Sequence, residues 1–132
     1  MILVDTSVWI ELLNAGLGSR VSEQQILQFR TCGPVAQEVL QGLREELVGN
    51  TFRQAFMSVP LLGDPVNAST FSFAAQIYRL GRRKGYTIRS SIDCLIAAIA
   101  IENDVTVWHR DRDFATISTY TALRSTQRLL TN

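Results

Sequence analysis

The stretch SSIDCLIAAIAIENDVTVWHRDRDF, residues 90–114, carries most of the information about the fold. Its first half is apolar on nearly every side of a helix, and VTVW at 105–108 is typical of a strand buried on both faces. A buried helix followed by a buried strand predicts a parallel sheet covered by helices. The apolar run at 94–101 is far shorter than the roughly 20 residues that cross a bilayer, so it predicts a core helix and no membrane anchor.

The rest of the chain continues the alternation of strands and helices. Pro34 suits a first helical turn, and Gly85 stands where a long helix is expected to end. No repeat or linker divides the chain, so we expect one domain over residues 1–132. Extended segments are expected at 1–4, 31–33, 59–62 and, weakly, 120–123, and further helices at 6–13, 19–30, 34–43, 50–57, 66–84 and 111–118.

Composition limits the class of protein. The formal net charge of +1 gives no strong overall attraction for an anionic partner, so any binding of nucleic acid must come from local clusters of charge. Cys32 and Cys94 are too few for a disulfide framework. The first residues carry no leader pattern, and we therefore expect a reduced, cytoplasmic protein.

Four carboxylates occupy positions where a parallel α/β fold gathers its ligands. Asp5 follows the first strand and Asp111 follows the VTVW strand, so both are expected at the edge formed by the carboxyl ends of the strands. Asp93 is the one acid in the opening turns of the apolar helix. Glu38 lies beside the apolar arc of its own helix, at the boundary between core and solvent.

Taken singly, these acids have ordinary structural explanations. Asp93 is compatible with a capping box formed with Ser90, and Glu38 with a solvated rim position. Asp111 and Asp113 suit the start of a helix, where negative charge is favoured. Taken together, carboxylates about 4 Å apart repel by roughly 1 to 4 kcal/mol per pair unless a proton or cation joins them. Oxygen ligands favour a hard divalent ion, which predicts Mg²⁺ or Mn²⁺.

Basic residues near the acids are candidates for substrate binding. Arg82 and Arg83 lie in the run RLGRRKGYTIR, which is compatible with a phosphate track and equally with a solvated helix end. Arg110 and Arg112 flank Asp111 and are better placed to contact a scissile strand.

The histidine and tryptophan residues bear on mechanism. His109 is the only histidine, which disfavours a ribonuclease that uses two histidines as general acid and base. At the end of a strand it is expected at the surface or at the start of a helix. Trp9 and Trp108 have apolar neighbours, so we expect them to pack in the core rather than to stack on bases.

Four segments in order, DTSVWIE, VAQEVLQGL, SSIDCLIAAIA and WHRDRDF, resemble the acidic motifs of PIN domains. Their wording is similar to that of VapC toxins, and the match extends from Asp5 to about Phe114. The resemblance implies a PIN-like three-layer α/β/α fold with a twisted, mainly parallel sheet of about five strands. It also implies a divalent-metal-dependent endoribonuclease acting on RNA, a homodimer, and neutralisation by a VapB-type antitoxin.

Residue by residue, the resemblance assigns Asp5 and Asp93 as the principal metal ligands, Glu38 as the acid of the middle helix and Asp111 as the fourth acid. Glu38 and Asp111 are expected to hold metal-bound waters or a second ion, and one of them to accept a proton from the attacking water. Asp113 is left open, because the family carries Asp at either or both positions of the D-x-D pair. Attack by water predicts 5′-phosphate and 3′-hydroxyl ends.

Other functions are compatible with parts of the sequence. A PIN nuclease in RNA maturation stays open, although the short chain favours the toxin. A non-catalytic PIN-like module that binds RNA or protein is disfavoured because all four acids are intact. A phospho-acceptor receiver domain needs paired acids after the first strand and a lysine after the last, whereas Val4 precedes Asp5 and the only lysine, Lys84, lies at a helix end.

Overall fold

A computed structural model of the chain describes residues 1–16, 20–43 and 47–128. In these ranges five strands form an all-parallel sheet with the order β3-β2-β1-β4-β5. This confirms the predicted parallel α/β architecture. The strands are β1 (Ile2–Val4), β2 (Phe29–Cys32), β3 (Leu61–Leu62), β4 (Thr106–Trp108) and β5 (Ser125–Thr126); the helices are α1 (Thr6–Ala15), α3 (Glu23–Ile26), α4 (Gly33–Gly42), α5 (Leu47–Met57), α6 (Ala68–Arg83), α7 (Ser91–Glu102) and α8 (Arg112–Ser118).

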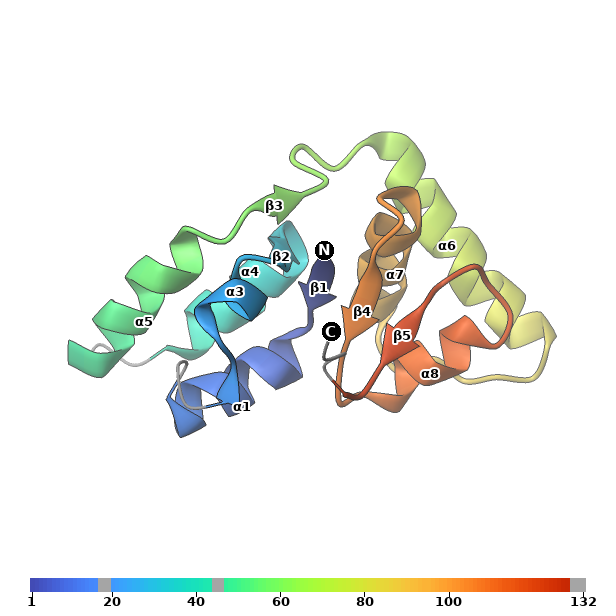
Figure 1. The fold of residues 1–132 in the computed structure, drawn as a ribbon. Helices are drawn as coiled ribbons and strands as arrows, with labels where there is room; N and C mark the ends of the chain where they lie inside the picture. The colour runs from blue at the N-terminus through green and yellow to red at the C-terminus, as the bar shows by residue number, and fades with distance from the viewer. Residues whose placement is uncertain (17–19, 44–46, 129–132) are drawn as a thin grey trace.

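The order of the strands reverses beside β1. The chain moves outward from β1 through β2 to β3, then crosses back to β4 on the other side of β1 and continues to β5. Connections between parallel strands are right-handed, so the helices before the reversal and the helices after it cover opposite faces of the sheet. In Figure 1, α1, α4 and α5 gather around the half of the sheet that contains β1 to β3, and α6, α7 and α8 around the half that contains β4 and β5. Ligands of such sheets bind outside the carboxyl ends of the strands at the reversal, here β1 and β4.

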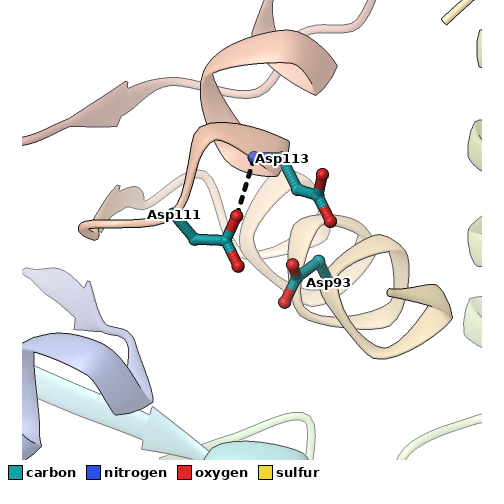
Figure 2. A group of neighbouring side chains, drawn as sticks. All are labelled: Asp93, Asp111 and Asp113. Carbon is teal, nitrogen blue, oxygen red and sulfur yellow. Dashed lines mark hydrogen bonds between the residues drawn. The ribbon is translucent and has the colours of Figure 1, made fainter. Parts of the chain in front are cut away.

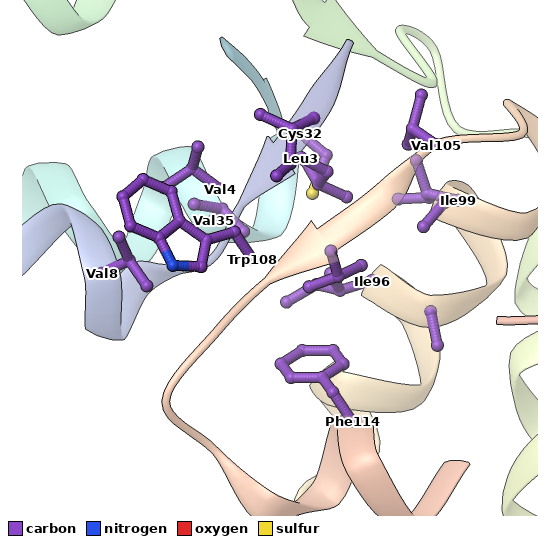
Figure 3. Close-up of a cluster of buried hydrophobic side chains, with 14 of the residues drawn as sticks. Leu3, Val4, Val8, Cys32, Val35, Ile96, Ile99, Val105, Trp108 and Phe114 are labelled. Atoms are coloured by element: carbon purple, nitrogen blue, oxygen red, sulfur yellow. The ribbon is translucent and has the colours of Figure 1, made fainter. Parts of the chain in front are cut away.

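The core is centred on the contact between α7 and the middle strands. Ile96 and Ile99 of α7 are buried together with Leu3 of β1 (Figure 3). Every residue of α7 from Asp93 to Ala100 is buried, which accounts for the apolar side chains on almost all sides of the helix. Within the described ranges, no helix is long and apolar enough to cross a membrane.

An aromatic cluster fills the space on the other side of β1. The Trp9 ring lies edge-on to Phe29 and Phe56, with centroids 5.7 and 5.1 Å away, and Phe29 contacts Trp108 at 5.8 Å. Both tryptophans are buried. Their predicted packing in the core is therefore confirmed.

The predicted helix over 19–30 is wrong in its second half, and its first residue lies outside the described part of the chain. α3 covers only four residues, started by a capping box between Ser22 and Gln25. Phe29 instead belongs to β2 and pairs with Ile2. The burial of Phe29 in the aromatic cluster overrides the helical spacing, while Leu27 is 72% exposed.

The weak strand expected at 120–123 is also wrong in position. β5 is Ser125–Thr126, and it pairs with the end of β4. The Tyr120 hydroxyl donates to the carbonyl of Ile77 at 3.0 Å, and its ring stacks on Tyr86. This anchoring to α6 holds the 120–123 segment in a turn, so that the strand begins later.

Candidate metal centre

Asp5 and Asp111 meet at the reversal of strand order. The N–H of Asp5 donates to the carbonyl of Trp108 at 2.9 Å, which joins the ends of β1 and β4. Asp5 is the N-cap residue of α1, and Asp111 is the N-cap residue of α8. The two strand ends thus place both carboxylates at the same edge of the sheet.

Asp93 comes to the same place from the first turn of α7. It is 7% exposed, and its Oδ2 is buried without a hydrogen-bond partner in the described part of the chain. One carboxylate oxygen from each of Asp93, Asp111 and Asp113 lies within 4.8 Å of the other two (Figure 2). The ion pairs found among the described residues involve Glu11 and Asp104, and none reaches these three acids. The group therefore has the oxygen ligands of a cation site and no protein counter-charge.

The capping-box explanation of Asp93 is wrong. Ser90 is the N-cap residue of α7, but its side chain makes no capping hydrogen bond. The backbone N–H of Ser90 donates to Asp113 Oδ2 at 3.1 Å, and the N–H of Arg89 donates to the same oxygen at 3.1 Å. Because Asp113 provides the acceptor at the start of α7, the Asp93 side chain is not needed there and points toward the other acids.

Burial and repulsion set the protonation of these acids. Burial, followed by the proximity of Asp113, Asp111 and Asp5, raises the pKa of Asp93 to about 9. Burial also raises the pKa of Asp5, with a smaller contribution from Asp111. Loss of part of the water around its carboxyl group, followed by repulsion from Asp5, raises the pKa of Glu38. Each of these shifts opposes negative charge, which a bound cation would restore.

Two hydroxyl groups that follow Asp5 hold the remaining acids. The Ser7 hydroxyl donates to Asp5 Oδ2 at 2.9 Å and accepts the N–H of Arg110 at 3.2 Å. The Thr6 hydroxyl donates to Glu38 Oε1 at 3.3 Å. Asp5 itself is the N-cap residue of α1, and the hydroxyl groups of Thr6 and Ser7 orient carboxylates. Hydroxyl residues directly after an acid at a strand end were the feature that could have indicated this role.

The five predicted acids are therefore not equivalent. Asp93, Asp111 and Asp113 form the close group. Asp5 lies beside this group and acts on Asp93 through charge, whereas the charged neighbour of Glu38 is Asp5. Glu38 is exposed at the rim, as its helical position predicted.

His109 is buried, at 1% exposure, so its expected surface position is wrong. The backbone N–H of His109 donates to the carbonyl of Thr126 at 3.0 Å, which extends the pairing of β4 and β5 and keeps the residue within the sheet. The ring contacts Phe114 at 5.3 Å, and its Nδ1 has no partner among the described residues. Burial lowers the pKa of His109, which favours a neutral imidazole beneath the site.

The predicted substrate-binding arginines fall into two groups. The guanidinium of Arg110 is engaged by Glu11, at 3.0 Å from Nε to Oε1, and donates to the carbonyl of Gln127. Arg112 is exposed in the first turn of α8, beside Asp111. Arg82 and Arg83 are exposed in the last turn of α6. None of these last three forms an ion pair with a described residue.

Comparison with known proteins gives consistent matches over nearly the whole chain. A family model described as the PIN domain matches residues 2–119. Ribonuclease VapC11 of Mycobacterium tuberculosis (strain ATCC 25618 / H37Rv) and VapC ribonuclease Mb1587 of Mycobacterium bovis are each 38% identical to this chain over 132 aligned residues, covering 95% of it and 97% of the relative.

Solved structures share the fold at lower sequence identity. VapBC2 from Rickettsia felis, bound to a DNA fragment from its promoter, matches with a TM-score of 0.75 and 18% identity, covering 96% of this chain and 98% of that chain. VapBC-5 from Mycobacterium tuberculosis matches with a TM-score of 0.67 and 19% identity, covering 93% of this chain and 94% of that chain.

Proposed function

Because the chain belongs to the PIN-domain family, we propose that it is a divalent-metal-dependent endoribonuclease that hydrolyses RNA phosphodiester bonds as the toxin of a VapBC-type pair. The observation that carries the proposal is the buried, unpartnered Oδ2 of Asp93 beside Asp111 and Asp113. The relatives that match the chain over 97% of their own length are named VapC ribonucleases, which supports RNA as the substrate.

The residues of the centre fit Mg²⁺, with Mn²⁺ as a substitute. The donors are carboxylate oxygens, which suit hard cations, and one of them is buried without a partner. Asp93 and Asp111 would hold the ion, with Asp5 at the adjoining strand end. When bound, such an ion polarises a phosphoryl oxygen and lowers the pKa of a water molecule.

The chain's own side chains then divide the remaining work. Glu38 is exposed at the rim and is held by Thr6, so it is the acid best placed to accept a proton from the attacking water. Ser7 fixes the orientation of the Asp5 carboxylate. Arg112, exposed beside Asp111, is the cation that we assign to the scissile phosphate. Cleavage by water leaves a 5′-phosphate and a 3′-hydroxyl.

The biological setting follows from the same family membership. We propose one PIN domain over residues 1–132, a homodimer, a cytoplasmic location and inhibition by a VapB-type antitoxin. The structural relatives VapBC2 and VapBC-5 are VapBC proteins, which supports the antitoxin as partner. A PIN nuclease in RNA maturation and a non-catalytic binding module are the alternatives that experiment must separate.

The test is cleavage of a mixed cellular RNA pool by folded protein free of antitoxin, with Mg²⁺, with Mn²⁺ and with EDTA. We expect metal-dependent cutting that is lost in Asp5→Asn and Asp93→Asn and kept in Asp104→Asn. Asp104 is a matched control because it is an exposed acid paired with Arg124, away from the centre. Absence of cutting by the wild type in either metal would favour the binding module, and cyclic-phosphate ends would contradict attack by water.

A further inference from the structure

Asp113 is bonded differently from the two acids beside it. Its side chain is 2% exposed, and Oδ2 accepts the N–H groups of both Arg89 and Ser90 at 3.1 Å. Oδ1 also lies 3.3 Å from the N–H of Arg89. Asp93, by contrast, has a buried oxygen with no partner among the described residues. The Asp113 carboxylate is thus already bound by backbone N–H groups, whereas Asp93 Oδ2 has no such bond among the described residues.

These bonds replace a local cap at the start of α7. Ser90 is the N-cap residue, and its own side chain makes no capping bond. The N–H groups at a helix start need acceptors, and here a carboxylate 23 residues away in the sequence provides one. Since Asp93 lies in the first turn of α7, the bond that fixes this turn also fixes Asp93.

Asp113 holds the third acid as well. Its backbone N–H donates to Asp111 Oδ1 at 2.9 Å, as the dashed line in Figure 2 shows. The side chain of Asp113 therefore orients α7, and its backbone orients Asp111. Asp113 therefore joins the start of α7, which carries Asp93, to the start of α8, where Asp111 is the N-cap residue.

We propose that Asp113 is a positioning residue, which sets the separation of Asp93 and Asp111 by bonding the start of α7, and that it is not itself a metal ligand. This inference rests on the proposed function in that it assumes a divalent ion at the centre. It assigns a role to the second acid of the D-x-D pair. The metal is left to Asp93 and Asp111, whose oxygens are less engaged by the protein.

The conservative variant separates the two roles. The substitution Asp113→Asn keeps an oxygen that can accept both N–H groups but loses the charge, whereas Asp113→Ala loses both. For a positioning residue, the amide variant rescues what alanine destroys. For a ligand, loss of the charge is decisive, and both variants fail alike.

The experiment measures amide exchange of Arg89 and Ser90 in metal-free protein, then Mn²⁺ binding by calorimetry without RNA. In Asp113→Ala we expect the amide protons of Arg89 and Ser90 to exchange about tenfold faster, and the affinity for Mn²⁺ to fall about tenfold. Asp113→Asn should keep the protection and remain within about threefold of wild-type affinity, whereas the control Asp111→Asn should lose more than about tenfold.

Two results would overturn the assignment. One is Asp113→Asn losing as much Mn²⁺ affinity as Asp111→Asn while Arg89 and Ser90 stay protected, which would make Asp113 a ligand. The other is unchanged protection in Asp113→Ala. If Asp113→Ala does not fold, the comparison of Asp113→Asn with Asp111→Asn decides alone. A wild type that binds no metal would refute the proposed function, and the positioning role is then judged by the amide exchange.

Discussion

Replacing Asp93 by asparagine is expected to stabilise the metal-free protein while abolishing its response to divalent metal. Asp93 is 7% exposed, and one of its carboxylate oxygens is buried without a partner among the described residues. Burial and the neighbouring acids raise its pKa to about 9, so its ionised form is unfavourable in the fold. Asparagine has nearly the same shape and no charge, and it therefore removes the repulsion without leaving a cavity.

The size of the effect follows from the spacing of the acids. Two unit charges 4.8 Å apart repel by about 0.9 kcal/mol in water and about 3.5 kcal/mol at an effective dielectric constant of about 20. Proton uptake by Asp93 relieves part of this repulsion, so we expect a net gain in unfolding free energy of about 1 to 3 kcal/mol at pH 8. For a chain of 132 residues this corresponds to a rise in Tm of about 3 to 12 °C.

The assay is thermal unfolding of wild type and Asp93→Asn at pH 8, in EDTA and in excess Mg²⁺. In EDTA the variant should melt higher; on adding Mg²⁺ the wild type should gain stability and the variant should not. Asp104→Asn serves as control, because asparagine tolerates the positive φ of 53° at this exposed position. An Asp93→Asn protein less stable than wild type in EDTA would refute the reasoning, since it would mean that the carboxylate has a favourable partner.

Three further outcomes can be checked with the same protein. The Tm of metal-free wild type should fall as pH rises from about 5 toward 9. The raised pKa of Asp93 contributes stability that is complete below the ordinary pKa of 3.8 and is lost as the pH rises to about 9. Asp93→Asn should flatten this dependence in melts recorded over a series of pH values. Ser7→Ala removes the donor to Asp5 Oδ2 and should lower kcat on a fluorogenic RNA by about 3- to 10-fold, with a loss of stability of no more than about 1.5 kcal/mol by denaturant titration. Gly81→Ala places a Cβ 2.5 Å from the Tyr120 hydroxyl oxygen and should cost about 1 to 3 kcal/mol in the same titration, of which Tyr120→Phe should recover part.

The place of the site could be predicted because it depends on local sequence. An acid that closely follows a buried strand stands at the carboxyl edge of the sheet. Asp5 comes directly after β1, and Asp111 follows β4 with His109 and Arg110 between them. Asp93 was identifiable because a lone carboxylate in an apolar helix needs partners. Their convergence also required the reversal of strand order, which the sequence alone did not specify.

The features that escaped prediction depend on contacts between distant residues. Phe29 has helical spacing with its neighbours, and only the burial of its ring beside Trp9 makes it part of a strand. The bond from Ser90 to Asp113 spans 23 residues, so the sequence offered the local capping box instead. His109 follows a short strand, and its burial depends on pairing with β5, whose position was also misjudged.

α7 explains how the fold tolerates an acidic centre without a counter-charge. All residues from Cys94 to Ala100 are buried, directly after Asp93. Burial of Leu95, Ile96 and Ile99 alone contributes roughly 5 to 9 kcal/mol as an upper estimate, at about 1.5 to 3 kcal/mol for each side chain. This exceeds the repulsion of about 1 to 3 kcal/mol expected from Asp93. The helix therefore stays in place against the charge on its first turn, and the carboxylate is held beside Asp111, where neutralisation by a cation is the favourable outcome.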